Sequence, residues 1–376
     1  MPSANRPIRV LQVVHGLVPG GIETWLVNVL RVIDRDRFQI DFVTSAGKPC
    51  YYDDTVRALG SKIHFVRSPK KPWIYASALL RTIRRERYDV VHAHLDHYGG
   101  FVMRVAQQAG VPKRIAHSHS DTSGKQAQAG TLRRMYLWGM KRWIKRSATL
   151  GLAVSDRAGG ALFPDWGRDK RWQVLYCGID THTFRRERNR EARARLGIGD
   201  DAIVIGHVGG FREPKNHTFL VDVAAAAIHR SPQLRLVLVG DGPLRPNIEE
   251  RVRRLGLDGK VVFTGYQPDP KEYMRDVFDV FVFPSLWEGL PLAVVEAQAA
   301  GIPCVISDRI STEVDLVKPL ITRRSLDRSA DKWAEALIDA VEQGVPAGRN
   351  PLAEIEASSF SMRTSVDSLQ EIYAAN

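Results

Sequence analysis

The chain has 376 residues, of which 44% are hydrophobic and 26% charged, as in a globular protein with room for two domains. No apolar run approaches the length that crosses a membrane, and three scattered cysteines indicate neither a disulfide framework nor a cysteine metal site. The net charge of +12 fits a phosphorylated substrate, an acidic membrane face or nucleic acid. Because the N-terminus lacks a signal-peptide core, we expect a cytoplasmic protein.

The first half of the chain alternates apolar strand-like runs with helix-like segments. A strand at 8–14 precedes a glycine-containing loop and a helix at about 22–32. Further strands are expected at 38–43, 62–66, 89–94, 114–119 and 150–154. This alternation predicts a parallel, doubly wound α/β sheet.

The same pattern restarts in the second half. Strands are expected at 202–208, 235–239, 260–264, 280–283 and 304–307, with helices at 217–229 and 245–255. We place the boundary near Gly178, which gives domains at 1–178 and 179–359. A last amphipathic helix is expected within 360–376.

The stretch 132–146 combines six basic residues with large apolar ones. Tyr136, Met140, Trp143 and Ile144 recur at helical spacing, which indicates an amphipathic helix. It either packs on the core with a solvated basic side or lies against an anionic bilayer. Nucleic acid is a third interpretation, but no nucleic-acid-binding motif supports it, and we predict no such partner.

The most informative segment is 283–297, FPSLWEGLPLAVVEA. It begins at the end of an apolar strand, passes through a short loop with Glu288 and Gly289, and continues into a helix. Pro291 suits the first turn of that helix. Free N–H groups and the positive end of a helix dipole favour a phosphate here. Glu288 before the helix and Glu296 inside it flank this position.

Taken alone, two glutamates eight positions apart indicate only solvated helix residues. Together with the strand, the Glu-Gly-Leu-Pro loop and the following AAGIPCVI segment, they resemble the signature of the retaining GT-B glycosyltransferases of family four, whose motif is E-x7-E. The resemblance runs from Gly20 to the terminal helix and is strongest to the bacterial exopolysaccharide and capsule branch.

The resemblance implies an α/β GT-B architecture, in which two Rossmann-like doubly wound domains face each other across a cleft and the helix at 360–376 packs back on the first. It implies that Glu288 is catalytic and bonds hydroxyls of the donor sugar, and that Glu296 bonds the ribose. The backbone N–H groups of Gly289 and Leu290 would bind the diphosphate.

A second loop, GGFREPKNH at 209–217, follows a buried strand. Cations there stabilise the charge that a diphosphate leaving group develops, although two solvated loop cations are the alternative. The loop resembles the family's Gly-Arg-Leu…Lys-Gly motif. Lys215 matches the family's lysine, whereas Gly210 stands where the family has arginine, and we expect Arg212 to supply that charge.

A third loop contains Gly20 and Gly21 before a helix, where glycine permits close approach of a substrate. An ordinary strand-to-helix turn is the alternative, and the dinucleotide-binding pattern G-x-G-x-x-G is absent. The loop resembles the family's Gly-Gly loop beside the transferred sugar and the acceptor.

Histidines follow two strands of the first half. His119 best matches the family's histidine near the sugar, with His117 second, and it is our second catalytic candidate. His92, His94 and His97 line the acceptor side or are structural. A metal site is the minor alternative. The pair Asp34 and Asp36 is interpreted as a turn and not as a metal–diphosphate site.

These motifs predict transfer of a sugar from a nucleotide-sugar to a hydroxyl acceptor with retained anomeric configuration, through same-face attack. The acceptor is expected to be a saccharide or a lipid-linked saccharide at the inner membrane face. No metal and no further cofactor are expected. An epimerase or hydrolase of the same architecture, and a non-catalytic sugar-nucleotide-binding scaffold, are the alternatives.

Overall fold

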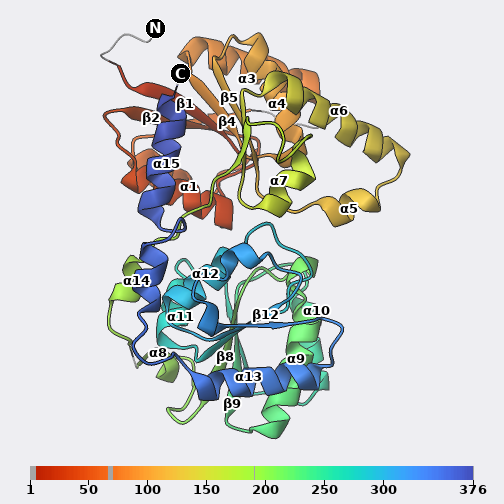
Figure 1. Ribbon diagram of the computed structural model, residues 1–376, viewed down its shortest axis with the longest axis vertical. Helices are drawn as coiled ribbons and strands as arrows, with labels where there is room; N and C mark the ends of the chain where they lie inside the picture. Colours follow the sequence, from red (N-terminus) through yellow and green to blue (C-terminus); the bar gives the residue numbers. More distant parts are fainter. Residues whose placement is uncertain (1–5, 67–70, 190, 376) are drawn as a thin grey trace. The chain divides into compact units, whose positions relative to one another are not determined.

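A computed structural model describes residues 6–66, 71–189 and 191–375. The chain forms two compact units, each with its own parallel sheet (Figure 1). The first unit comprises Met1–Gly178 and Met362–Asn376, and the second comprises Ile179–Ser361. The last helix therefore belongs to the same unit as the first strand.

The sheet of the first unit has the order β3-β2-β1-β4-β5-β6-β7 and is parallel throughout. Its central strands are buried and mostly apolar, as expected when helices cover both faces, but they also carry the buried polar residues Gln12, His92 and His117. The strands are β1 (Ile8–Val13), β2 (Phe38–Thr44), β3 (Ile63–Phe65), β4 (Val90–Ala93), β5 (Lys113–Ser118), β6 (Leu150–Ala153) and β7 (Trp172–Val174).

The helices of the first unit pack in two groups, with α4 in contact with both α3 and α6, and with α1 beside α15 (Figure 1). A Cβ added to Gly100 of α4 would lie 2.3 Å from the carbonyl oxygen of Met140, so glycine lets α4 and α6 pack closely. The helices are α1 (Gly21–Val32), α2 (Asp53–Ala58), α3 (Pro72–Glu86), η1 (Asp96–Tyr98), α4 (Gly99–Gln108), α5 (Ser123–Ala127), α6 (Thr131–Ser147), α7 (Asp156–Leu162) and α15 (Met362–Ala374).

The second unit repeats the doubly wound plan. Its sheet has the order β10-β9-β8-β11-β12-β13 and is also parallel. The strands are β8 (Ile203–Val208), β9 (Leu234–Val239), β10 (Val261–Gly265), β11 (Val280–Phe283), β12 (Cys304–Ser307) and β13 (Ile321–Arg324).

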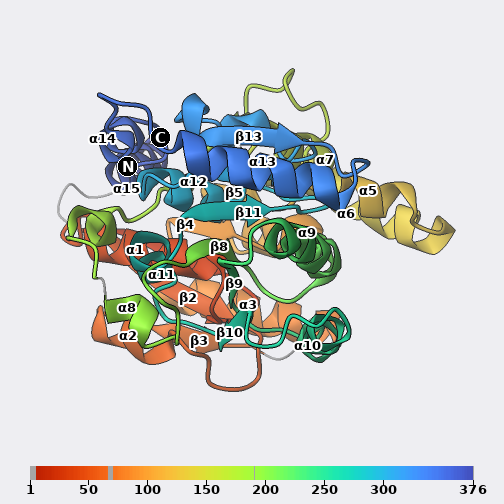
Figure 2. The same cartoon turned by 90° about the horizontal axis from the view of Figure 1, so that it is seen from below.

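In the second unit, α9 and α13 pack together over the sheet, and Figure 2 shows them side by side. Their apolar faces join β8, β9 and β11 in one buried core that includes Leu220 and Trp333. The helices are η2 (His182–Arg185), α8 (Glu191–Ala194), η3 (Glu213–Lys215), α9 (His217–Arg230), α10 (Arg245–Arg254), α11 (Lys271–Asp276), α12 (Leu292–Ala299), η4 (Thr312–Val314), η5 (Lys318–Leu320), α13 (Ala330–Gln343) and α14 (Pro351–Glu356).

Both sheets reverse their winding direction once, between β1 and β4 in the first unit and between β8 and β11 in the second. Loops diverge at such a switch point, so the carboxyl ends of its two strands are the usual ligand site of a doubly wound sheet. These two positions are where functional side chains are to be sought.

The sequence patterns predicted most of these strands to within two residues, but β7 and β13 were not predicted. Both are short edge strands, and β13, with the sequence ITRR, carries two arginines. β7 has only three residues with the polar Gln173 at its centre, and half of β13 is arginine, so neither segment shows an apolar run.

Candidate active site

Lys215 and Glu288 meet at the switch point of the second unit. Lys215 ends the loop after β8, Glu288 lies in the loop after β11, and Lys215 Nζ is 2.8 Å from Glu288 Oε1. Their side chains are 22% and 15% exposed. Lys215 Nζ also stands 4.6 Å from the ring centroid of Phe283, the last residue of β11. A shielded cation and a carboxylate thus face each other where the fold favours a ligand.

Two hydrogen bonds to backbone carbonyls hold the two loops together. The amide nitrogen of Leu286 donates to the carbonyl of Pro214 over 2.8 Å, and Asn216 Nδ2 donates to the carbonyl of Pro284 over 3.2 Å. Asn216 has a φ of 54°, a left-handed conformation that asparagine tolerates. The geometry of the Lys215–Glu288 pair therefore rests on main-chain contacts as well as on its own attraction.

The Gly209–Gly210 turn packs against a second glycine turn. A Cβ on Gly240 would lie 2.2 Å from the carbonyl oxygen of Gly209, which only glycine avoids. Gly210 itself has room, because its added Cβ would be 3.5 Å from the nearest atom, the carbonyl oxygen of Asp241. Arg212 is exposed, and its guanidinium has no partner among the described residues. The structure thus leaves Arg212 available for an anionic ligand.

Gly289 and Leu290 lie between Glu288 and α12, as the motif requires. The prediction that Pro291 lies in the first helical turn was wrong: Pro291 is the N-cap, with φ −80° and ψ 90°, and α12 begins at Leu292. The fixed φ of proline is compatible with the N-cap and with the first helical position. Because the ψ of Pro291 is extended, the helix begins one residue later than predicted. Only Glu296 of the two glutamates is helical.

Glu296 lies in α12 and is partly buried. Burial raises the pKa of its carboxyl to about 7, and the nearby Lys271 offsets part of the rise. A carboxyl with this pKa changes its protonation readily when a hydrogen-bond donor reaches it.

In the first unit, Gly20 is the N-cap of α1 and Gly21 its first residue, and both are exposed. A Cβ on Gly21 would meet nothing within 4 Å, whereas one on Gly20 would lie 2.7 Å from Glu23 Oε2. Burial raises the pKa of Glu23 to about 7. The loop is open on the side of Gly21, as close approach of a substrate requires.

His119 follows β5 and belongs to a cluster with His92, His94 and His117. These three are buried, whereas His119 is partly exposed. His119 Nε2 lies 2.8 Å from His94 Nδ1, and burial lowers the pKa of His119 to about 3. The ligand atoms of His92, His94 and His117 all lie within 4.8 Å of one another. The lowered pKa keeps the His119 ring neutral at pH 7. That the reaction needs no metal stays a prediction.

Two further sequence predictions concern other positions. Asp34 Oδ1 accepts hydrogen bonds from the backbone nitrogens of Asp36 and Arg37, which confirms a turn. His97 lies in η1 and does not join the histidine cluster; burial lowers its pKa to about 4.

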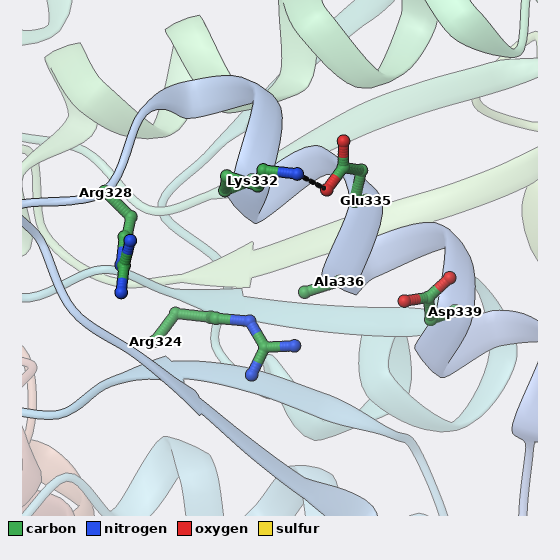
Figure 3. A pocket seen from close by; sticks show the side chains of 6 residues that line it. All are labelled: Arg324, Arg328, Lys332, Glu335, Ala336 and Asp339. Carbon is green, nitrogen blue, oxygen red and sulfur yellow. Dashed lines mark hydrogen bonds and ion pairs between the residues drawn. The ribbon is translucent and has the colours of Figure 1, made fainter.

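A separate pocket at the end of β13 and along α13 contains the Lys332–Glu335 pair and no residue of the predicted site (Figure 3).

Comparison with known proteins gives matches along both units. The family model for glycosyl transferases group 1 matches residues 188–354, and that for glycosyltransferase family 4 matches residues 19–183. EpsF of Bacillus subtilis, named as a glycosyltransferase, is 38% identical over 371 residues and covers 97% of this chain and 96% of its own. The chain therefore belongs to this glycosyltransferase family.

Two other similar proteins add detail. A galactosyltransferase of Escherichia coli, named for UDP-Gal and α-D-GlcNAc-diphosphoundecaprenol, is 25% identical to this glycosyltransferase and covers 82% of this chain and 81% of its own. HepE of Anabaena, solved with UDP and glucose, superposes with a TM-score of 0.82 at 19% identity and covers 98% of this chain and 100% of its own. These likenesses confirm the predicted GT-B fold of two Rossmann-like units.

Sequence reasoning did not find several residues that shape the site. Gln12 and Tyr373 both contact the histidine cluster, and Asn216 joins the two loops of the second unit. The alternating histidines on neighbouring strands were a usable signal for the cluster. Nothing in the sequence pattern pointed to Gln12 or Tyr373, because their contacts join segments at opposite ends of the chain.

Proposed function

We propose that the protein is a retaining glycosyltransferase that transfers a sugar from a nucleotide-sugar to a hydroxyl of a growing cell-surface saccharide. The second unit binds the donor, and the first unit supplies the acceptor side. The Lys215–Glu288 pair at the switch point of the second unit is the observation that carries the proposal. The names of the E. coli and Anabaena proteins support a uridine nucleotide as the donor class.

The pair divides the work on the donor. Lys215 faces the diphosphate, whose negative charge grows as the glycosidic bond breaks, so its attraction is strongest in the transition state. Glu288 accepts hydrogen bonds from sugar hydroxyls, and Glu296, eight positions later, accepts them from the ribose. Because lysine and arginine supply the positive charge, the reaction requires no divalent cation.

The mechanism we favour is same-face attack. A double displacement requires a carboxylate nucleophile close to the anomeric carbon, and Glu288 is already paired with Lys215. The acceptor hydroxyl instead attacks from the side on which the diphosphate leaves. The departing phosphate oxygen takes the proton of that hydroxyl, and because attack and departure occur on one face, the anomeric configuration is retained.

The acceptor side is served by α6, which we propose to lie against an anionic membrane. Leu137, Met140 and Ile144 face the core, but Leu132, Met135 and Trp138 are 84%, 65% and 66% exposed. The guanidinium of Arg142 lies over the Trp138 ring and that of Arg133 over Tyr136. An exposed apolar edge bordered by cations suits a bilayer interface. Among the described residues, every helix is too short or too polar to span a bilayer.

A thermal-shift screen against nucleotide-sugars, followed by a transfer assay, tests the function. A bound donor raises the melting temperature by mass action. Incubation of that donor and the protein with a lipid-linked saccharide is expected to give free nucleotide and a lengthened saccharide with the donor's anomeric configuration. The transfer rate is expected to be the same with and without EDTA. Free nucleotide with an unchanged saccharide would support a hydrolase instead.

A further inference from the structure

Four histidines stand on one face of two neighbouring strands, and we call them the histidine array. His92 and His94 come from β4 and its end, and His117 and His119 from β5 and its end. Alternate residues of a strand point to the same face, and β4 pairs directly with β5. Trp25 of α1 covers the array, with ring centroids 5.9–6.4 Å from those of the last three.

Hydrogen bonds lead from His119 to the C-terminal helix. His119 Nε2 is 2.8 Å from His94 Nδ1, and His94 Nε2 is 2.8 Å from Gln12 Oε1. The amide nitrogen of Gln12 donates to the hydroxyl of Tyr373 over 2.8 Å. Gln12 belongs to β1 and His94 directly follows β4, and these are the two strands of the switch point in the first unit.

The series of hydrogen bonds, which we call the hydrogen-bond chain, continues from Tyr373 to the other two histidines of the array. The Tyr373 hydroxyl is 2.8 Å from His92 Nδ1, and His92 Nε2 is 3.1 Å from His117 Nδ1. Burial lowers the pKa of each of the four imidazoles, so all are neutral at pH 7. Each neutral ring has one N–H and one bare nitrogen.

These contacts fix which atom is the donor in each bond of the hydrogen-bond chain. Gln12 Oε1 can only accept, so His94 Nε2 donates to it and His94 Nδ1 is bare. That bare atom accepts from His119 Nε2, which leaves His119 Nδ1 without a hydrogen. A flip of the Gln12 amide would reverse every bond and put a hydrogen on His119 Nδ1.

The far end favours the first direction. His117 Nε2 is buried and has no hydrogen-bond partner among the described residues. In the first direction it carries a hydrogen, and the Trp25 ring, perpendicular to His117 at 88°, is a weak acceptor for buried N–H groups. In the reverse direction it would be a buried bare nitrogen without a donor, which costs more.

We propose that Gln12 and Tyr373 are positioning residues that hold His119 in the Nε2–H tautomer, so that its bare Nδ1 accepts a hydrogen bond from a substrate hydroxyl. His119 is the only partly exposed member of the array and the one that a substrate can reach. The inference rests on the proposed function for the identity of the hydroxyl, which belongs to a sugar. The tautomer itself depends only on the first unit.

A metal ion on His92, His94 and His117 is the competing explanation of the array. Five of the six ring nitrogens of these residues already take part in the chain, and only His117 Nε2 does not. A metal would have to break the chain, since it needs a bare nitrogen from each ring.

Nitrogen NMR of the ¹⁵N-histidine-labelled protein tests the proposal without a transfer assay, because the two tautomers have distinct ring-nitrogen shifts. The His119 signals are assigned with His119→Gln. We expect His119 as the Nε2–H tautomer in the wild type and a mixture in Tyr373→Phe and in Gln12→Met. The double variant should match the single ones, since either change breaks the same chain.

Tyr88→Phe is the matched control. Its hydroxyl is buried, lies 2.9 Å from both His64 Nε2 and Asp41 Oδ2, and has no part in the chain. It should leave the His119 signals unchanged. An unaltered His119 tautomer in Tyr373→Phe would overturn the proposal, as would the Nδ1–H form in the wild type. If each protein molecule binds one Zn²⁺ and the imidazole N–H signals then disappear, the array is a metal site and the proposal is overturned.

Kinetics separate this inference from the proposed function. Tyr373→Phe should lower kcat/KM about threefold to tenfold, the effect of one weakened hydrogen bond, and Tyr88→Phe should not. The loss should vanish with the deoxy donor or acceptor that lacks the bonded hydroxyl. If the wild type transfers no sugar but shows the expected tautomers, the proposed function fails while the positioning chain stands.

Discussion

Lys215 Nζ and Glu288 Oε1 lie 2.8 Å apart, although one follows β8 and the other follows β11. The two strands are neighbours at the switch point of the second sheet, and main-chain bonds join their loops. The pair links two motifs that the sequence shows only as separate segments. In our account, a diphosphate takes over part of the contact of Lys215 when the donor binds.

Replacing Lys215 by methionine should slow transfer strongly while the protein stays folded. Removing one preorganised donor to a developing oxyanion costs about 2.7–4 kcal/mol, or roughly 100- to 1,000-fold in kcat. Steady-state kinetics with saturating donor measure the loss. A kcat within threefold of the wild type would show that Lys215 does not stabilise the leaving group.

Glu288→Ala should abolish measurable turnover and leave the melting temperature within a few degrees of the wild type. Lys215 keeps 22% of its side chain exposed and its Nζ also faces the Phe283 ring, so water and the ring partly replace the lost carboxylate and limit the destabilisation that breaking a shielded pair causes. Transfer assays and thermal unfolding check the two parts. Near wild-type turnover would contradict the role of Glu288.

Donor binding should release protons near neutral pH through Glu296. Its pKa is about 7 in the free protein, and hydrogen bonds from the ribose favour the charged form, which lowers the pKa. Binding should therefore strengthen as pH rises from 6 to 8. The enthalpy of nucleotide binding, titrated in buffers of different ionisation enthalpy, gives the number of protons released.

Glu296→Gln is the control for this linkage, because its amide cannot titrate. The variant should bind more weakly and show no dependence of enthalpy on the buffer. Proton release that persists in Glu296→Gln would assign the titration to another group, and none in the wild type would exclude a ribose contact.

The exposed edge of α6 should govern binding to anionic vesicles. Replacing Leu132, Met135 and Trp138 by alanine removes apolar contacts each worth roughly 1.5–3 kcal/mol when fully buried, so the partition coefficient should fall more than tenfold. Sedimentation with vesicles containing phosphatidylglycerol measures it. Leu255→Ala, at an exposed leucine of the second unit (43% exposed, against 84% for Leu132), should have no effect. Unchanged sedimentation of the triple variant would end the membrane proposal.

Gly210→Arg should compensate for the loss of Arg212. The site has room for a side chain, with the nearest atom 3.5 Å from an added Cβ. We expect Arg212→Gln to raise the KM of the donor several-fold and Gly210→Arg to restore it in the double variant. If Arg212→Gln leaves the KM unchanged, Arg212 does not supply the charge that Gly210 lacks.

The sequence could predict both sheets because their central strands are continuous apolar runs that end in glycine-rich loops, such as β8 before Gly209. It could predict Lys215 and Glu288 as candidates because each has a local motif. It could not predict their contact, which depends on strand order. The partners of His119 were out of reach as well, because Gln12 and Tyr373 come together only when α15 packs in the first unit.

The position of the exposed apolar residues of α6 was only partly predictable. Helical spacing placed Tyr136, Met140, Trp143 and Ile144 on one face and left open whether the helix packs on the core or lies against a membrane; Met140 and Ile144 are buried, whereas Tyr136 and Trp143 are only partly so. Burial on a helix depends on which neighbour it meets, here α4, and no local pattern in the sequence gives that information.

The most direct test of the account is the affinity of UDP for the wild type, Lys215→Met and Lys332→Met, measured by isothermal titration calorimetry. Lys332 lines the separate pocket on α13 (Figure 3) and provides a matched loss of one lysine. We expect at least a tenfold rise in Kd for Lys215→Met and no change for Lys332→Met. An unchanged Kd in Lys215→Met, or a loss of binding in Lys332→Met alone, would contradict the placement of the donor diphosphate beside Lys215 and Glu288.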